Sequence, residues 1–392
     1  MDLIPGPDQV VAAAVNLATL LRRGRLADVA PMRRTVLTDR GPGTVHRYRP
    51  LPGVASHGDP VLLVGPLGAP ALCYDLRRGC SLVEHLLEGG RPTYLVELDG
   101  RPDGTALERL VDDVLPTAVT EVARDTAGHG VHLVGWGPGG LAAVLAAASR
   151  PDLPLVSLTS LAAPFDVDQV SDVAPLRPFP RVAGGRAGLM SHAHRLLGGA
   201  RVPLLGRVGR LPAVDSLLTK PLTLAWTLDD ADFLAQVEAV DRLRARTAPD
   251  HRGRRFGRLY HRVLAAASAV EGSVTIDGGR EIRLDGLRVP LLVVAGAGDT
   301  IAPAASVRRL LALLPAGADA RFEVVEGGHL GMLTGRRARG TTWPLVERWL
   351  DAGCAATGDA VAPPGRAASA PAIGSNPRRR YASAASRTLA GA

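Results

Sequence analysis

The sequence predicts an α/β protein with a doubly wound, mostly parallel sheet and an inserted helical cap. Short apolar runs alternate with helical patterns over residues 61–161, which is the order that a parallel sheet requires. The alternation stops near residue 166 and resumes at residue 289, so a separate segment interrupts the sheet. With 392 residues, 46% of them hydrophobic, the chain is long enough to bury a sizeable core.

An amphipathic pattern opens the chain, and we expect a packing helix there, within an N-terminal helical segment of residues 1–50. Basic residues end the pattern, as is common at the C-terminal end of a helix. The residues of this pattern are Val10, Ala14, Leu17, Leu21, Arg22 and Arg23.

The first half of the predicted core covers residues 51–165. Ser81 is the expected N-cap of its first helix, and Gly89 and Gly90 are expected to end that helix. An amphipathic helix over residues 107–123 and an alanine-rich helix after Pro138 follow. The expected strands are residues 61–64, 93–98 and 131–135, with a fourth within 153–167.

Residues 166–285 are predicted to form the helical cap, because strand patterns are missing there until residue 273. The core resumes over residues 286–352 with a strand ending before Asp299, a helix over 304–314 and a strand over 321–326. A last helix is expected over residues 342–351. Residues 353–392 are rich in alanine, serine and arginine and are predicted to be a disordered tail.

The formal net charge of +8 suggests an anionic partner, but its distribution argues against one. Lys220 is the only lysine, so arginine supplies almost all of the positive charge, and five arginines of the tail face the single Asp359 there. We therefore expect solvated charge and no nucleic-acid partner.

Cysteine usage and the N-terminus indicate a reducing compartment, which we expect to be the cytoplasm. Cys73, Cys80 and Cys354 are too few for a disulfide framework and lack the spacing of metal ligands. Asn16 interrupts the apolar stretch near the N-terminus, and no cationic region precedes it. We expect no transmembrane segment and no metal site.

The segment VHLVGWGPGGLAA contains a glycine-rich turn that allows two interpretations. Residues 135–140 match G-x-G-x-x-G, which would make the chain a dinucleotide-binding oxidoreductase. That fingerprint requires an acidic residue about 20 positions later, at the end of the next strand. The next strand ends at Leu161, Ala162 and Ala163, without an acid. We expect no cofactor, and the dinucleotide interpretation remains an alternative.

The second interpretation is a G-x-S-x-G nucleophile elbow in which Gly137 replaces the nucleophile. This motif requires an acid and then a histidine, each following a strand. Asp299 follows the strand LLVVAGAG and His329 follows FEVVEGG, in the required order. Asp299 and His329 are therefore the candidate catalytic pair.

Four segments together resemble the α/β-hydrolase domain of polyhydroxyalkanoate synthases, and the likeness runs from about Val61 to Leu350. They are LCYDLRRGCSLVEHLLEGGRPTYLVEL, VHLVGWGPGGLAA, GAGDTIAP and EGGHLGML. The resemblance implies the α/β-hydrolase fold. In that family an elbow cysteine takes a 3-hydroxyacyl group from a coenzyme A thioester, and an aspartate and a histidine activate it.

Carried over residue by residue, the resemblance implies Asp299 as the aspartate, His329 as the histidine and Gly137 as the substituted nucleophile. The N–H of the residue after the nucleophile normally donates to the oxyanion, but Pro138 has none. Leu67, in the loop after the first core strand, is the expected second oxyanion element.

We therefore expect a catalytically deficient protein that binds an acyl chain or an acyl-CoA-like molecule. An active homologous synthase or a second copy of the chain is its expected protein partner. The alternative is an active hydrolase or acyltransferase that uses His329 and Asp299 with a non-standard nucleophile. Cys73, Thr159 and Ser160 are the candidates for that role, although Cys73 is better interpreted as a buried apolar residue.

Overall fold

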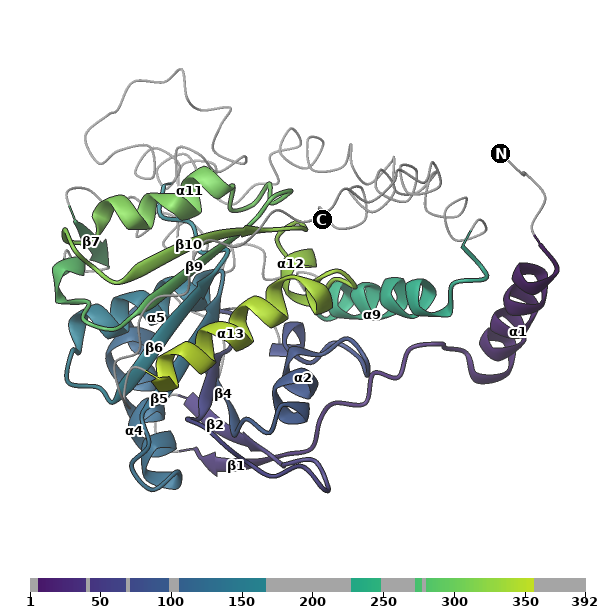
Figure 1. The fold of residues 1–392 in the computed structure, drawn as a ribbon, viewed down its shortest axis with the longest axis horizontal. Coiled ribbons are helices and arrows are strands. Elements are labelled where there is room, and N and C mark those ends of the chain that lie inside the picture. Colours follow the sequence, from purple (N-terminus) through teal and green to yellow (C-terminus); the bar gives the residue numbers. More distant parts are fainter. Residues whose placement is uncertain are drawn as a thin grey trace, which may run out of the picture.

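The structure, a computed structural model, describes residues 6–39, 43–67, 71–98, 106–166, 227–247, 272–276 and 280–355. An eight-stranded sheet runs through these residues (Figure 1). In spatial order its strands are β1 (Arg34–Thr38), β2 (Gly43–Tyr48), β4 (Thr93–Leu98), β3 (Val61–Val64), β5 (Val131–Trp136), β6 (Leu155–Leu161), β9 (Leu291–Gly296) and β10 (Ala320–Val325).

All neighbours from β4 to β10 are parallel, and the chain winds outward from β3 in both directions. Helices cover both faces of the sheet, so strands such as β3 and β9 are apolar and buried along their whole length. This topology confirms the predicted doubly wound class, and it is that of the α/β-hydrolase fold.

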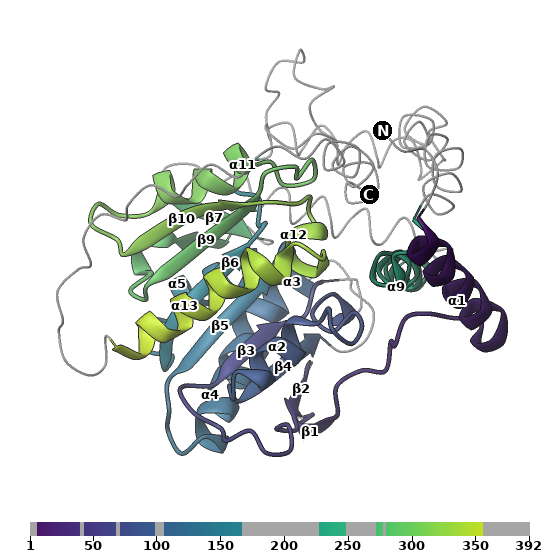
Figure 2. The same cartoon turned by 45° about the vertical axis from the view of Figure 1, so that its right-hand side comes forward.

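Two groups of helices sandwich the sheet (Figure 2). On one face α2 (Leu82–Glu88) packs against α13 (Thr342–Ala355), and on the other α4 (Leu115–Asp125) packs against α5 (Pro138–Ser149). The remaining described helical elements of the core are η1 (Ala71–Cys73), α3 (Ala106–Arg109), η2 (Leu110–Val114), η6 (Leu284–Gly286), α11 (Ala304–Arg308), η7 (Arg309–Leu313), α12 (Gly331–Thr334) and η8 (Ala338–Gly340).

Several expected elements form where the sequence placed them. Ser81 caps α2 through a hydrogen bond from the N–H of Glu84 to its hydroxyl, 3.0 Å long. The helix expected over 107–123 is a continuous helical stretch from α3 to α4, with a π-helical turn at η2.

The core begins earlier in the chain than the predicted residue 51, because residues 1–50 contain two strands, β1 and β2, besides a helix. β2 pairs antiparallel with β4, and β1 pairs with β2, so both strands extend the main sheet. β1 lies at the edge of the sheet and is mostly exposed, so it lacks the apolar run that marks the central strands.

The helix α1 (Pro7–Arg23) forms as expected, but it does not pack through its apolar residues. Val11, Val15 and Leu21 are exposed, and Asn16 is the buried residue of this helix. The prediction of a packing helix is wrong in this respect, because the side of α1 that faces inward is the one with Asn16, beside which Ala12, Ala13 and Leu20 are only partly buried.

The described part of the predicted cap contains one helix, α9 (Ala231–Thr247), and one hairpin of β7 (Ser273–Ile276) and β8 (Arg280–Arg283). The hairpin shows that the segment is not entirely helical. Residues 167–226 and 248–271 of the cap lie outside the described residues, as do residues 356–392 of the predicted tail.

Asp232 joins α9 to the core through a cluster of arginines. Its carboxylate lies 2.7 Å from the guanidinium of the buried Arg77, 2.7 Å from Arg336 and 2.9 Å from Arg339. Burial by itself would raise the pKa of Asp232, but the hydrogen bonds from Arg77 and Arg339 lower it below its usual value. These ion pairs supplement the buried apolar residues of α9, among them Ala239 and Leu243, that pack against the core.

A buried histidine at the start of β5 makes stability depend on pH. His132 shares a 2.8 Å hydrogen bond between its Nδ1 atom and the hydroxyl of Ser157. Burial and then the nearby Arg91 cation lower the pKa of His132 from 6.5 to about 4. The folded protein therefore resists the protonation that the unfolded chain accepts.

We predict that His132 contributes stability above pH 6.5 that is lost as the pH falls towards 4. Between pH 7 and pH 4 the lost contribution should approach about 3 kcal/mol, because each pKa unit corresponds to about 1.4 kcal/mol. Urea unfolding of the wild type and of His132→Asn, which retains a polar partner for Ser157, measures it. An equal pH dependence in both proteins would contradict the assignment.

Candidate active site

Gly137, Asp299 and His329 lie beyond the carboxyl ends of three parallel strands. Gly137 follows β5, Asp299 follows β9, and His329 follows β10. Carboxyl ends of parallel strands meet at one edge of the sheet, where the sites of α/β proteins form. The fold therefore brings together Gly137 and His329, which are 192 positions apart in the sequence. A hydrogen bond between the neighbouring Trp136 and His329 joins the two loops directly.

The chain passes from β5 to α5 through a sharp turn at Gly137. Its backbone has φ 54° and ψ −124°, a combination that residues with a side chain adopt only under strain. The N–H of Gly137 donates to the carbonyl of Leu161 at 2.8 Å, and the carbonyl of Gly137 accepts from Leu141 at 3.1 Å. This strand, turn and helix have the geometry of a nucleophile elbow.

The other glycines of the turn are required for packing. A Cβ atom on Gly135 would lie 2.5 Å from the carbonyl oxygen of Gly139, and one on Gly139 would lie 3.0 Å from that of Val64. A Cβ atom on Gly140 would lie 2.9 Å from the carbonyl oxygen of Gly135. The close contact of α5 with β5 and β3 thus accounts for the G-x-G-x-x-G spacing without a dinucleotide.

Asp299, which is buried, and His329, which is partly buried, form a hydrogen-bonded pair. Oδ1 of Asp299 accepts from the N–H groups of Ile301 and Ala302 at 2.9 and 2.8 Å, and Oδ2 lies 2.8 Å from Nδ1 of His329. An ionised carboxylate can only accept, so the imidazole proton lies on Nδ1 and leaves Nε2 as an acceptor. This is the arrangement of a general base oriented by an acid.

The Nε2 atom of His329 faces the elbow. A Cβ atom added to Gly137 would lie 3.4 Å from Nε2 and 3.7 Å from Cε1 of His329. The side chain of any residue at position 137 would therefore begin in contact with the base.

Trp136 is a residue of the site that the sequence pattern did not reveal. Its indole N–H donates to the carbonyl of His329 at 3.0 Å, and its ring centroid lies 4.7 Å from that of the imidazole. These two contacts hold the loop of the histidine against the elbow. The only sequence signal was a large aromatic side chain between two glycines.

The chemistry at the start of α5 differs from that of an active elbow. Pro138 is the first residue of the helix and has no N–H to donate. Leu67, the expected second oxyanion element, lies buried in the loop after β3. The structure does not describe residues 68–70, which continue this loop.

The alternative nucleophiles are all buried. Cys73 is 3% exposed, and burial raises the pKa of its thiol far above the usual value, so little thiolate forms near neutral pH. Thr159 and Ser160 are fully buried, and neither hydroxyl has a hydrogen-bond partner among the described residues. A Cβ atom on Gly140 would lie 3.0 Å from the Ser160 hydroxyl, which places Ser160 beneath the first turn of α5.

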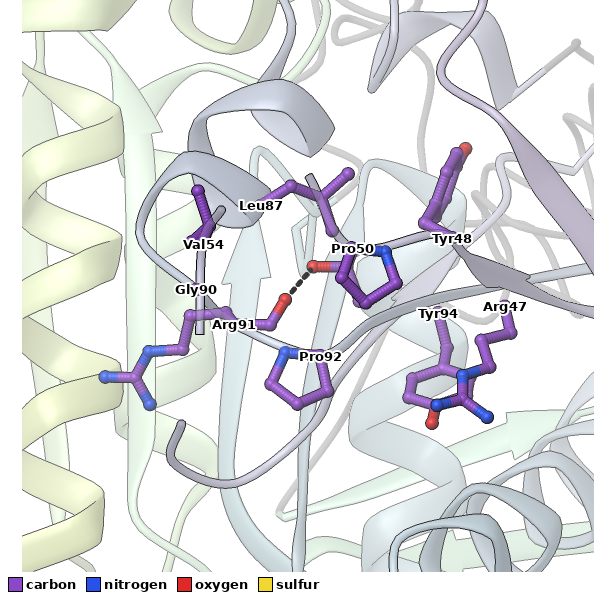
Figure 3. A pocket seen from close by; sticks show the side chains of 10 residues that line it. Arg47, Tyr48, Pro50, Val54, Leu87, Gly90, Arg91, Pro92 and Tyr94 are labelled. Carbon is purple, nitrogen blue, oxygen red and sulfur yellow. Dashed lines mark hydrogen bonds between the residues drawn. The ribbon is translucent and has the colours of Figure 1, made fainter. Parts of the chain in front are cut away.

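A separate pocket lies at the opposite edge of the sheet (Figure 3). Thr93 and Tyr94, at the start of β4, and Arg47 and Tyr48, at the end of β2, belong to its lining. The elbow, Asp299 and His329 lie beyond the carboxyl ends of the parallel strands, whereas this pocket lies at the start of β4. The pocket is therefore not part of the candidate active site.

The residues that the structure describes contain no group of three or more histidine, cysteine or acidic residues placed to hold a metal ion. They also contain no helix with the length and apolar character needed to cross a membrane.

No protein-family model matches the chain. The chain is similar to the poly(3-hydroxyalkanoate) polymerase subunit PhaC of Haloferax mediterranei, with 23% identity over 301 residues, and to that of Synechocystis sp., with 25% identity over 302 residues. Each match covers 74% of this chain. The first match spans 58% of the length of the Haloferax protein, and the second spans 77% of the length of the Synechocystis protein. These matches confirm the resemblance to polyhydroxyalkanoate synthases.

Solved structures with a similar chain course include two enzymes. One is proline iminopeptidase from Mycobacterium smegmatis, with 19% identity, a TM-score of 0.46 and coverage of 83% of this chain and 99% of that one. The other is the enol-lactonase from Burkholderia xenovorans, with 16% identity, a TM-score of 0.43 and coverage of 79% and 97%.

The geometry of the turn predicts an order of stability among glycine-to-alanine variants. Gly137→Ala should lose about 1–3 kcal/mol of unfolding free energy through backbone strain. Gly135→Ala should lose more, because its Cβ would meet backbone atoms of α5 at 2.5–2.6 Å. Urea unfolding checks the order.

Gly340→Ala is the matched control, because a Cβ there meets no atom within 4 Å and its φ is not positive. It should leave the unfolding free energy nearly unchanged. If Gly137→Ala proved as stable as this control, the backbone would not hold the elbow conformation.

Proposed function

We propose that this chain, an α/β-hydrolase-fold protein similar to poly(3-hydroxyalkanoate) polymerases, binds an acyl chain or acyl thioester without turning it over. One observation carries the proposal. The His329 base faces position 137 at 3.4 Å from a Cβ atom that glycine does not have. His329 and Asp299 are arranged beside position 137, where glycine provides no nucleophile.

Acyl transfer from a thioester needs two groups that this elbow lacks. A thiol or hydroxyl must attack the carbonyl carbon and give its proton to the base, but Gly137 has neither group. An N–H must then donate to the oxyanion of the tetrahedral intermediate, but Pro138 has none. Removal of one such donor typically costs about 10² to 10³ in rate, so the two losses support a protein without turnover.

The same two residues favour the folded turn. Glycine adopts the φ 54° conformation with little strain, and proline is well suited to the first position of a helix. Gly137 and Pro138 thus favour local stability at a position where an active enzyme needs reactive groups. This combination supports a turn that is retained for structure and binding.

The ligand class and the partner rest on the relatives. Their names describe polymerases of 3-hydroxyalkanoates, so a short 3-hydroxyacyl coenzyme A is the first ligand to test. An active homologous synthase is the proposed catalytic partner. The proposed compartment is the cytoplasm, in keeping with the free, buried Cys73 and Cys80.

We predict that Gly137→Cys alone cleaves a short acyl thioester only slowly, because Pro138 still provides no oxyanion donor. Gly137→Cys with Pro138→Leu restores the N–H and should be about 10² to 10³ faster than the single variant. Release of free coenzyme A, followed with a thiol reagent, measures both rates.

His329→Ala in the double variant should abolish the gain, since the cysteine would lose its base. Circular dichroism of each variant shows whether the fold is intact. Equal rates in the single and double variants would contradict the role of Pro138. A folded double variant without any rate would show that Asp299 and His329 cannot support this chemistry.

The wild type should bind 3-hydroxybutyryl coenzyme A and release it unchanged. Calorimetry measures the binding, and mass spectrometry measures the intact thioester and any acyl adduct on the protein. Coenzyme A release that His329→Ala abolishes would favour the active alternative, and an adduct on Cys73 would identify its nucleophile. Absence of binding would contradict the proposed ligand class.

A further inference from the structure

The space beside Gly137 is open in front of the candidate histidine. A Cβ atom added to Gly137 would have the Nε2 and Cε1 atoms of His329 within 4 Å, and no other atom of the described chain apart from its neighbours in sequence. The side chain of His329 keeps 14% of its surface exposed, so the imidazole is in contact with solvent. We call this space the Gly137 seat, because an active elbow places its nucleophilic atom there.

The Nε2 atom of His329 has no hydrogen-bond partner among the described residues. Nδ1 lies 2.8 Å from the carboxylate of Asp299, so Nε2 is the nitrogen that remains for a ligand. An oxygen atom in the Gly137 seat can lie at hydrogen-bond distance from Nε2. Residue 137 supplies no such atom, so the ligand itself must bring it.

A free carboxylic acid brings the atom that residue 137 lacks. In the covalent intermediate of an enzyme with a serine nucleophile, the acyl carbon is bonded to the side-chain oxygen of the serine. A carboxylate has the same acyl carbon bonded to an oxygen of its own. From this match we propose that the Gly137 seat binds the carboxylate of a free acyl acid, with one oxygen on Nε2 of His329.

The head group of a thioester suits this site less well. The carbonyl oxygen of a bound thioester normally accepts from the N–H of the residue after the nucleophile, and Pro138 has no N–H. The inference rests on the proposed function, since it assigns the head group within the same acyl-binding site. It narrows the ligand class from acyl compounds in general to free acids.

A carboxylate on Nε2 requires a second proton on His329. With a proton on Nδ1 alone, Nε2 and the carboxylate would both be acceptors. Once Nε2 is protonated, the imidazolium donates to Asp299 on one side and to the ligand on the other. Hydrogen bonds between two charged groups are the strong ones. Each acid that binds therefore takes up one proton wherever the free imidazole is neutral.

The groups packed against His329 favour this protonated form. Asp299, after β9, contributes a carboxylate whose side chain is 0% exposed. From β5, the ring centroid of Trp136 lies 4.7 Å from that of the imidazole, and the face of an aromatic ring attracts a cation. On the histidine's own loop, the charge of Glu326 is paired with Arg337 at 2.7 Å. The elbow residues next to Trp136 are uncharged.

We predict that the full chain binds 3-hydroxyoctanoate about 10- to 100-fold more tightly than 3-hydroxyoctanamide at pH 6, as measured by calorimetry. The amide has nearly the same shape but no charge, and this range is that of a hydrogen bond between charged groups. The S-ethyl thioester of the same acid should also bind more weakly than the acid.

Proton uptake is the signature of the proposed contact. Calorimetry in two buffers of different ionisation enthalpy counts the protons that enter with each ligand. The uptake should approach one proton per acid as the pH is raised from 6 to 8. Over the same range the affinity should fall by up to tenfold per pH unit, because the free site must first gain that proton.

Two variants test the assignment to the Gly137 seat. His329→Gln should weaken binding of the acid by about 10- to 100-fold and abolish the proton uptake. Gly137→Ser fills the seat with a hydroxyl of the protein and should also weaken binding of the acid. Circular dichroism shows whether each variant is folded.

His129→Gln is the matched control. Nδ1 of His129 lies 2.9 Å from the carboxylate of Asp59, so it too forms a histidine–aspartate pair. Its side chain is 59% exposed, and it precedes the amino end of β5, away from the elbow. This variant should leave the affinity and the proton uptake unchanged.

The outcomes separate this inference from the proposed function. Binding of the thioester or the amide as tight as that of the acid would overturn the preference for a carboxylate and leave an acyl-binding site. Binding of the acid at pH 8 without proton uptake, or with an uptake that His329→Gln retains, would remove His329 from the contact. If neither the acid nor the thioester binds, the proposed function fails together with the inference.

Discussion

The close contact between β5 and the first turn of α5 is the constraint on which the candidate site depends. A Cβ atom on Gly135 would lie 2.5 Å from the carbonyl oxygen of Gly139, and a Cβ atom on Gly139 would lie 3.0 Å from that of Val64, so the packing leaves little room for a side chain at either position. Between these two closely packed glycines the backbone reverses at Gly137, which has a φ of 54°. The reversal aims position 137 out of the sheet edge, towards His329. The elbow conformation is thus a property of the packing and does not require a nucleophile.

The pair of Asp299 and His329 likewise holds its geometry without a nucleophile. Burying a carboxylate is unfavourable unless its oxygens are hydrogen-bonded. The N–H groups of Ile301 and Ala302 and the imidazole satisfy both oxygens of Asp299. None of these partners comes from the elbow, so the hydrogen bonds of Asp299 do not depend on the residue at position 137. The proposed binding site therefore does not require a nucleophile at position 137.

Two different kinds of contact hold the molecule together. The sheet and its helices pack through apolar side chains, and α9 combines buried apolar residues such as Ala239 and Leu243 with ion pairs, whereas α1 is attached through hydrogen bonds of Gln9 and Asn16. Arg77, buried in the core, pairs with Asp232 of α9, and Asn16 turns inward from α1. The valines and leucines on the other side of α1, such as Val11 and Leu21, remain exposed.

The sequence by itself determined the class of the fold and the order of the candidate residues. Apolar runs such as residues 61–64 and 291–296 reflect burial on both faces of a parallel sheet, and this burial imposes a pattern that is visible locally. Tertiary structure alone decided that residues 34–38 and 43–48 join the sheet, because they pair antiparallel at its edge and the outer strand, residues 34–38, is mostly exposed and needs no apolar run. It also decided which side of α1 faces inward, since periodicity identifies an apolar face but not its partner. The contacts of His329 with Trp136 and position 137 depend on strands far apart in the chain, so no local pattern could reveal them.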